Sequence, residues 1–319
     1  MTNLLELYAK LIGLALIGFI LGRILPAKVP MRLGQWLFWI GVPTSIVAFL
    51  RKTDLSGQVW VAPAVAYTAI LCGAVLAWLV IYLIELRINI TIPSSTQGSL
   101  ILAAMVGNTG YLGYPIVLSL VGTQYFAWAL FYDLLGTTLG AYGFGVALAA
   151  KFGSGSQNSD RNSPQKTLRK ERNQILKAIL INPALWSFGV GLLLRQVPLP
   201  DIAVSCLDFL AWSAIASSLI LIGMRLSKLS SWGSLKLASI SLIIKMVFVP
   251  FVLGICLHRL GLTGKIAQVI VLQMAMPPAF ATLVLAETFN LDRELAVTAV
   301  SVGSMILLIT LPFWLWFFQ

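Results

Sequence analysis

The stretch GNTGYLGYP, residues 107–115, combines side chains that donate hydrogen bonds with residues that interrupt helices. Proline at position 115 has no N–H to give a helix, and it disfavours helical backbone at the residue before it. Because the glycines permit unwound or left-handed backbone, we expect residues 108–114 to be non-helical. The donors and helix breakers of this stretch are the first candidate substrate-binding residues: Asn108, Thr109, Gly110, Tyr111, Gly113 and Pro115.

A second interruption is predicted in AQVIVLQMAMPPAFATLVLAE, residues 267–287, where two consecutive prolines lie in the middle of an apolar run. Gln273 lies about one helical turn before them. It could bond a ligand, or it could make a helix–helix hydrogen bond. The candidate binding residues here are Gln273, Met276, Pro277 and Pro278.

The chemistry that these two stretches favour is anion binding. We expect Pro115 and Pro278 in the first turns of helices that follow the breaks, where a missing N–H costs little. Helix N-termini carry unpaired N–H groups and the positive end of the helix dipole. Two such ends meeting inside a membrane would bind a carboxylate without a formal positive charge. For one break alone, a structural kink is the competing interpretation.

Two charged residues fall inside apolar runs: Asp133 in FYDLLGTTLG and Lys245 in SLIIKMVFVP. A charge at bilayer depth costs about 2.5–3.5 kcal/mol on insertion scales, so such residues usually have partners or a function. The two could pair, or Asp133 could bind a proton or cation, which makes both candidates for ion or proton coupling. Alternatively, Asp133 is a structural charge near an interface and Lys245 extends outward to the membrane surface.

The elements that must position these residues are membrane-spanning helices. The chain has 319 residues, 59% of them hydrophobic and 10% charged, with a mean hydropathy of +0.91. This composition indicates an all-α integral membrane protein, because the apolar runs are continuous rather than alternating. We predict ten spans: about 4–25, 33–50, 59–84, 97–121, 124–150, 175–194, 204–226, 235–257, 264–287 and 295–318.

The chain divides at KFGSGSQNSDRNSPQKTLRKERNQ, residues 151–174, which is flexible in composition and then strongly basic. We expect five helices in 1–150 and five in 175–319, with one discontinuous crossover helix in the fourth span of each half. Because five is odd, the halves would have opposite topology. This is the pattern of an inverted repeat whose broken helices cross at the membrane midplane.

Lysine and arginine are about three times more frequent in one set of loops than in the other, and the richer side is expected to be cytoplasmic. This places both termini outside and the 151–174 loop inside, in what we expect to be a bacterial inner (plasma) membrane. The net charge of +11 then reflects topology and contact with membrane lipid, so no nucleic-acid partner is expected.

Little in the sequence favours enzyme chemistry. The three cysteines form no CxxC motif, there is one histidine, and no ATP-binding motif is present, so we expect neither a cofactor nor a metal. Gly18 and Gly22 have the small-xxx-small spacing that allows close helix packing. The same spacing could serve a dimer.

These motifs, taken in order along nearly the whole chain, resemble the auxin efflux carrier family. GNTGYLGYP is similar to the first crossover of that family, MPPAFATLVLAETFNLD to the second, GVPTSIVAF to the second span and NPALWSFGVGLLL to the sixth. The resemblance implies ten helices, a scaffold domain and a mobile transport domain that moves like an elevator, and often a homodimer. It implies organic anion substrates, either indole-3-acetate or dicarboxylates such as malate and malonate. It also implies that Asn108 contacts the carboxylate and that Pro115 and Pro277 or Pro278 are the crossover prolines.

We therefore expect a secondary transporter of an organic carboxylate. A membrane sensor that binds a ligand without moving it, and a sodium-coupled symporter of the bile-acid-carrier type, are the alternatives. Net flux of substrate would separate a transporter from a sensor, and chemical conversion would separate an enzyme from both.

Overall fold

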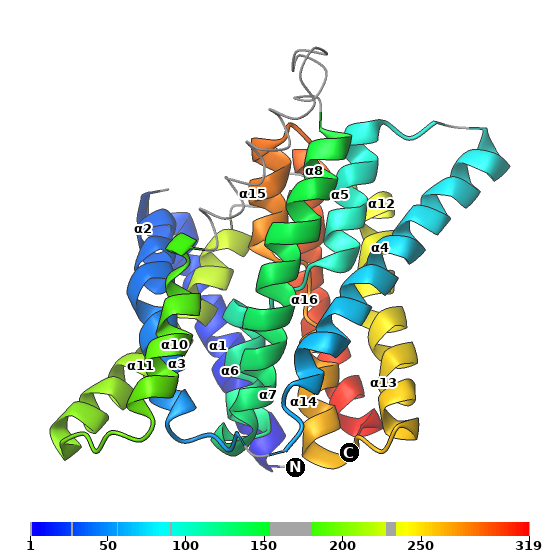
Figure 1. Cartoon of the computed structure of the whole chain (residues 1–319). Coiled ribbons are helices and arrows are strands. Elements are labelled where there is room, and N and C mark those ends of the chain that lie inside the picture. Colours follow the sequence, from blue (N-terminus) through cyan, green and yellow to red (C-terminus); the bar gives the residue numbers. More distant parts are fainter. Residues whose placement is uncertain are drawn as a thin grey trace. The chain divides into compact units, whose positions relative to one another are not determined.

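The computed structural model describes residues 2–26, 28–55, 57–89, 91–153, 180–227 and 234–318. In those residues the protein is helical, with one isolated β-bridge and no strand (Figure 1). Within the same residues, six helical segments are long and apolar enough to span a membrane. The predicted all-α membrane fold is confirmed at this level. Most of the basic loop predicted at 151–174 lies outside the described residues.

The six long segments are Lys28–Leu50, Val61–Ile88, Thr123–Phe152, Asp201–Leu226, Leu235–Arg259 and Arg293–Phe317. Three of them are single helices: α4 (Val61–Ile88), α11 (Asp201–Leu226) and α16 (Arg293–Phe317). The other three contain π-helical turns, such as η7 (Ile244–Phe248) between α12 (Leu235–Ile243) and α13 (Val249–Arg259). The other helices include α1 (Thr2–Ile24), α5 (Ser94–Met105), α6 (Tyr114–Leu120), α10 (Pro183–Leu194), α14 (Gly264–Met274) and α15 (Phe280–Thr288).

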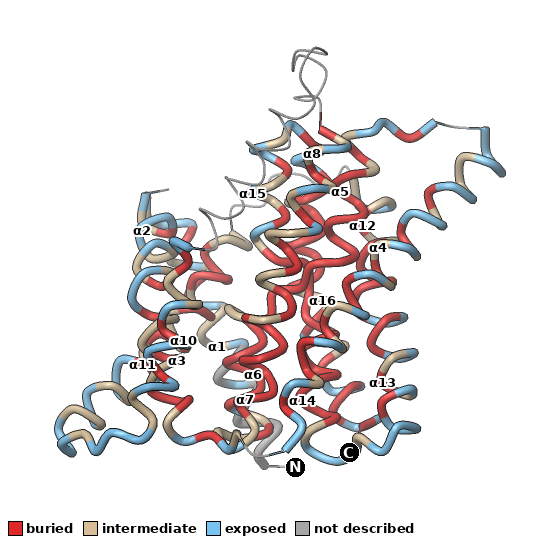
Figure 2. The backbone as a smooth tube through the Cα atoms, viewed as in Figure 1, coloured by how far each residue is buried: buried red, intermediate tan, exposed pale blue. Residues whose placement is uncertain are grey.

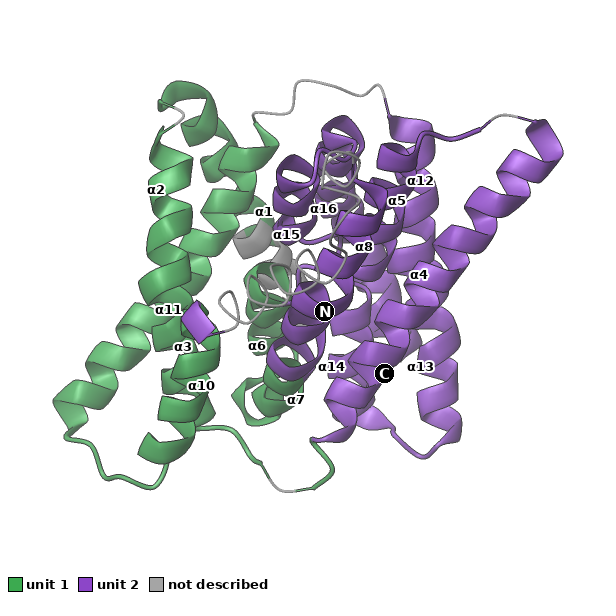
Figure 3. Ribbon diagram, turned by 45° about the horizontal axis from the view of Figure 1, so that its top comes forward, with its two compact units in different colours: residues 1–59, 110–131, 182–230 green, residues 60–109, 132–181, 231–319 purple. Residues whose placement is uncertain are grey.

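The helices form two compact units, shown in green and purple in Figure 3. Unit 1 consists of residues 1–59, 110–131 and 182–230. Unit 2 consists of residues 60–109, 132–181 and 231–319. Each unit takes segments from both sides of the basic loop. These units are defined by how compactly their residues pack, which does not test internal symmetry. The five-helix repeats 1–150 and 175–319 therefore remain a prediction.

Unit 1 is held together by helices whose backbones approach closely. α1 packs along α11, and a Cβ atom at Gly18 would lie 2.0 Å from the carbonyl oxygen of Ile220. A Cβ at Gly22 would lie 2.7 Å from the Met224 backbone. Only glycine leaves room for this approach. The Gly18/Gly22 spacing therefore serves packing within the chain, as one of its two interpretations predicted.

Unit 2 has α5 at its centre. All residues from Gly98 to Met105 are buried, and α5 packs against α4, α12 and α16. Figure 2 shows α5 and α16 as largely buried, whereas α4 and α13 alternate between buried and exposed stretches. The exposed residues of α4 include Leu71, Val75, Trp78 and Leu83. Such an apolar outer face is what lipid tails would cover in a membrane.

Candidate functional site

The two predicted interruptions are present in unit 2, and they pair with each other. α5 ends at Met105 and α14 ends at Met274. Gly107 and Pro278 then form an isolated antiparallel bridge. The Asn108 N–H donates to the Pro277 carbonyl at 2.7 Å, and the N–H of Ala279 donates to the Val106 carbonyl at 2.9 Å. Backbone groups freed by the breaks are thus satisfied by the opposite break, as buried backbone requires.

The first interruption is shorter than predicted. The expectation of non-helical backbone is right for Asn108 and wrong for residues 109–114, because a π-helical turn, η2 (Thr109–Gly113), leads directly into α6. Only the three residues Val106–Asn108 lie outside helices. Pro115 is in the first turn of α6, as predicted, and the wider π turn before it lets the chain stay helical. No glycine between 107 and 113 has a positive φ, so left-handed backbone is not the reason for these glycines.

The second interruption places its prolines before the following helix rather than in its first turn. α15 begins at Phe280, with Ala279 in the N-cap position. Pro277 and Pro278 belong instead to the segment that bridges to Gly107. The fixed φ of proline suits extended backbone, and the donor at this bridge is Ala279, so the missing proline N–H costs nothing.

Two buried amides beside the interruptions have groups without partners in the described part of the chain. The Asn108 side chain is 3% exposed and its Nδ2 has no hydrogen-bond partner. Gln273 is 0% exposed and neither its Nε2 nor its Oε1 has one. The helix–helix hydrogen bond considered for Gln273 is therefore absent from the described residues. An unsatisfied buried polar group costs about 1–3 kcal/mol, and a ligand or water that binds there removes that cost.

Each of the two buried charges makes a hydrogen bond with a residue next to an interruption. The Thr109 hydroxyl donates to Oδ1 of Asp133, whose side chain is 8% exposed. Lys245 is 3% exposed, and its Nζ donates to the Met274 carbonyl at 2.9 Å. The alternative in which Lys245 extends outward to the membrane surface is therefore wrong, because the ammonium group turns inward to the end of α14. Pairing between Asp133 and Lys245 remains a prediction.

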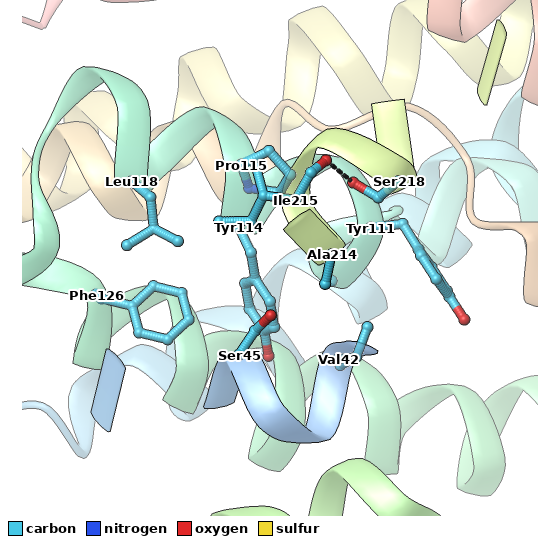
Figure 4. Close-up of a pocket in the computed structure, with 11 residues that line it drawn as sticks. Val42, Ser45, Tyr111, Tyr114, Pro115, Leu118, Phe126, Ala214, Ile215 and Ser218 are labelled. Atoms are coloured by element: carbon cyan, nitrogen blue, oxygen red, sulfur yellow. Dashed lines mark hydrogen bonds between the residues drawn. The ribbon is translucent and has the colours of Figure 1, made fainter. Parts of the chain in front are cut away.

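Unit 1 contains a separate pocket beside Pro115. It holds about 310 Å³ of empty space, counting its open mouth. Figure 4 shows its lining, and the aromatic rings of Tyr114 and Phe126 meet edge to face with centroids 5.0 Å apart. The hydroxyl of Ser218 donates to the Ile215 carbonyl at 2.7 Å and that of Ser45 donates to Gly41 at 2.8 Å. The pocket therefore offers an apolar wall with hydroxyl oxygens as acceptors.

The structure distributes the predicted binding residues over both units. The contacts above join Asn108 to Pro277 and Thr109 to Asp133. Unit 2 contains eight of the predicted site residues: Asn108, Thr109, Asp133, Lys245, Gln273, Met276, Pro277 and Pro278. Gly110, Tyr111 and Pro115 line the pocket of unit 1. Gly113 also belongs to unit 1 and is buried, but it does not line that pocket.

Several residues of the site were not predicted. Ser45 and Ser218 lie in ordinary apolar helices, where nothing in the sequence marks them as pocket residues. Gly303 of α16 lies behind the second interruption, since a Cβ atom there would be 3.0 Å from both Pro277 and Pro278. A lone glycine in a predicted span is a signal for such close approach, although it does not name the partner.

Interrupted helices whose breaks meet inside a helical bundle are typical of secondary transporters. Residues 4–315 match the model of a family described as "Membrane transport protein", and the chain belongs to this family, as its resemblance to auxin efflux carriers predicted. The chain is 27% identical over 97% of its length to an "Uncharacterized transporter" of Methanothermobacter thermautotrophicus, covering 96% of that protein. It is 25% identical over 89% of its length to an uncharacterized transporter of Methanocaldococcus jannaschii, covering 88% of that protein.

Proposed function

We propose that this membrane transporter is a secondary carrier of an organic carboxylate anion. One observation carries the proposal: the buried Nδ2 of Asn108, beside the paired interruptions, has no hydrogen-bond partner among the described residues. An amide N–H is a good donor to a carboxylate oxygen, and a hydrogen bond to a charged acceptor is stronger than one to a neutral acceptor. The bound carboxylate would supply the acceptor that this amide lacks among the described residues.

Helix ends at the breaks support the same substrate charge. The backbone after the first break is helical from Thr109 to Leu120, through η2 and α6. The backbone after the second break is helical from Phe280. The first N–H groups of such segments lack intrahelical partners and favour negative charge. They would add to the Asn108 amide as groups that attract an anion.

The pocket of unit 1 has a mainly apolar lining. Tyr111, Tyr114 and Phe126 contribute aromatic surface to its lining, and the two serine hydroxyls already donate to backbone carbonyls. This lining suits an aromatic ring better than a second carboxylate. The resemblance to auxin efflux carriers supports an auxin-like acid such as indole-3-acetate, or a dicarboxylate such as malate or malonate, as the substrate.

The mechanism that we propose is alternating access of the elevator type, in a ten-helix 5+5 inverted repeat. Both interruptions belong to unit 2, which is compact by itself and could carry a bound anion as one body. We place the chain in the plasma membrane, with both termini outside and the 151–174 loop in the cytoplasm, because of the distribution of lysine and arginine. A homodimer is an assembly that this proposal allows.

Uptake into proteoliposomes tests the function directly. We would measure uptake of labelled indole-3-acetate, malate and malonate, with and without gradients of pH and sodium, for the wild type and for Asn108→Ala. We expect saturable uptake of one acid that is strongly reduced in the variant. Saturable binding without net flux would support the sensor alternative, and uptake that requires sodium would support the sodium-coupled symporter.

A further inference from the structure

Lys245 holds a positive charge inside unit 2. Among the described residues, only Asp133 also combines a formal charge with a buried side chain. Lys245 lies on the π-helical turn η7, a kind of local widening that often occurs at functional sites. The indole N–H of Trp314 donates to the Met246 carbonyl of this turn at 3.1 Å. The lysine backbone is thus fixed by a neighbouring helix, α16.

The ammonium group of Lys245 binds the end of one interrupted helix. Its Nζ donates to the carbonyl of Met274 at 2.9 Å, and Met274 is the last residue of α14. The last carbonyls of a helix lack intrahelical partners and form the negative end of the helix dipole. A cation at this position therefore meets both a hydrogen-bond acceptor and a favourable field.

The same side chain also touches the other interruption. A Cβ atom at Gly107 would lie 2.9 Å from Cε of Lys245 and 3.1 Å from its Nζ. Gly107 follows the end of α5 by two residues. An added Cβ at Gly107 would force the end of the lysine side chain to shift. The φ of Gly107 is not positive, so this glycine serves close approach and not left-handed backbone. One cation thus contacts both of the segments that the backbone hydrogen bonds join.

We propose that Lys245 is a tethered cation that takes the place of a dissociable metal cation at the paired interruptions. In transporters with broken helices, the carbonyl-rich C-terminal ends of the half-helices are positions where sodium binds. Here a covalently held ammonium already occupies such a position. The carrier therefore needs no sodium ion to complete this site. The prediction that transport needs no sodium rests on the proposed function. The prediction that the folded protein binds no sodium at this position does not.

Thermal unfolding of the purified full-length protein tests cation binding without any substrate. The midpoint would be measured in sodium, potassium and N-methylglucamine chloride at equal ionic strength. We expect wild-type midpoints that agree to about 1 °C, because a cation that does not bind the folded state cannot stabilise it. A midpoint raised specifically by sodium in the wild type overturns the proposal, and this result needs no variant.

Variants test whether the lysine fills the position. We expect Lys245→Met to unfold about 4 °C or more below the wild type in N-methylglucamine chloride, and to recover part of the loss in sodium chloride. Gly107→Ala keeps the lysine but displaces its end. We expect this variant also to be stabilised by sodium, and it serves as the test if Lys245→Met does not fold. Lys236→Met, at an exposed position of the same span, is the control and should show no sodium response. The absence of a sodium response in both Lys245→Met and Gly107→Ala contradicts the proposal.

Transport separates this proposal from the proposed function. In proteoliposomes, we expect wild-type uptake of the accepted carboxylate to be the same with sodium or N-methylglucamine outside. If sodium raises that uptake, Lys245 does not replace a sodium ion, and this proposal fails. The proposed carrier function would still stand. If no labelled acid is transported while the unfolding results are as expected, the proposed substrate class fails and the tethered cation stands.

Discussion

Asn108 uses its two N–H donors for different purposes. Its backbone N–H joins the interruptions by donating to Pro277, and its side-chain amide has no acceptor among the described residues. The first role belongs to the backbone and survives any side-chain substitution that folds. The second role belongs to the side chain alone. Substitution at position 108 can therefore remove substrate binding while the backbone pairing persists.

Asn108→Asp should abolish carboxylate uptake, because it replaces the donor by a negative charge at the position where we propose that the anion binds. Loss of one hydrogen bond to a charged group costs about 1.5–3 kcal/mol, roughly a ten- to hundredfold loss of affinity, and charge repulsion adds to it. The measurement is uptake and equilibrium binding of the accepted acid. Asn182→Asp is a matched control, since Asn182 is also buried and caps α10, a role that aspartate performs equally well.

Asp133→Asn tests ion or proton coupling. The Thr109 hydroxyl next to the first interruption donates to the Asp133 carboxylate, so a change of protonation there reaches the site directly. If Asp133 carries the coupling, the variant should still bind the acid but lose the dependence of uptake on the pH gradient. Thr288→Val, which removes an exposed hydroxyl that bonds only its own helix, serves as a control for general effects. Unchanged pH and sodium dependence in Asp133→Asn would exclude the coupling role.

At the residue scale, the sequence was informative where a residue type is costly in a membrane. The polar Asn108, the prolines and the two charges all stood out because apolar helices rarely contain them. Ser45 and Ser218 did not stand out, because serine can satisfy its hydroxyl within its own helix, as both do here. The partner of Lys245 was also unpredictable, because a backbone carbonyl leaves no trace in the residue type.

Helix α1 shows what close packing demands of a single element. Gly18 approaches the backbone of Ile220 so closely that any side chain there would separate α1 from α11. Gly13, on the same helix, has nothing within 4 Å of an added Cβ. Gly18→Val should therefore lower the stability of unit 1 by about 1–3 kcal/mol or more, as overpacking does, whereas Gly13→Val should have little effect. Thermal unfolding in detergent would compare the two, and equal loss in both would refute the packing interpretation.

Helix α16 should support the second interruption through Gly303. A Cβ at this position would lie 2.8 Å from Leu242 and 3.0 Å from each of the two prolines. We expect Gly303→Ala to reduce uptake several-fold by shifting Pro277 and Pro278, with a smaller fall in thermal stability. Gly143→Ala, at a glycine with open space around it, is the matched control. Normal uptake by Gly303→Ala would show that the prolines tolerate displacement.

At the element scale, apolar runs and positions of prolines placed the helices well, because lipid allows few other structures. The predicted run 204–226 corresponds to α11 (Asp201–Leu226), and the predicted break near 277 corresponds to the gap between α14 and α15. The predicted length of the first break was wrong, because Gly and Pro lower helix propensity but do not decide whether a segment is helical. A π-helical turn accommodates Pro115, and such turns have no reliable signature in one sequence.

For the whole molecule, alternating access predicts that one residue can be reached from either side of the membrane in turn. The test is Asn108→Cys in a chain whose native Cys72, Cys206 and Cys256 are replaced by serine. A membrane-impermeant maleimide should label this cysteine from both sides, and the accepted acid should slow labelling if the variant still binds it. The chain with serine at all three native positions is the control for background. Labelling from one side only would contradict an elevator and would favour a receptor.

The pairing of Asn108 with Pro277 also has a consequence for biosynthesis. The first interruption leaves the ribosome long before its partner does, by roughly 170 residues, or about 10–30 s at ~5–20 residues per second. During that interval its unpaired amide and carbonyl groups cannot face lipid without cost. The segment 94–120 must therefore stay near water or the insertion machinery until Pro277 is made. A chain truncated before α14 should be recognised by membrane quality-control proteases and degraded, even though every helix that precedes α14 has been synthesised.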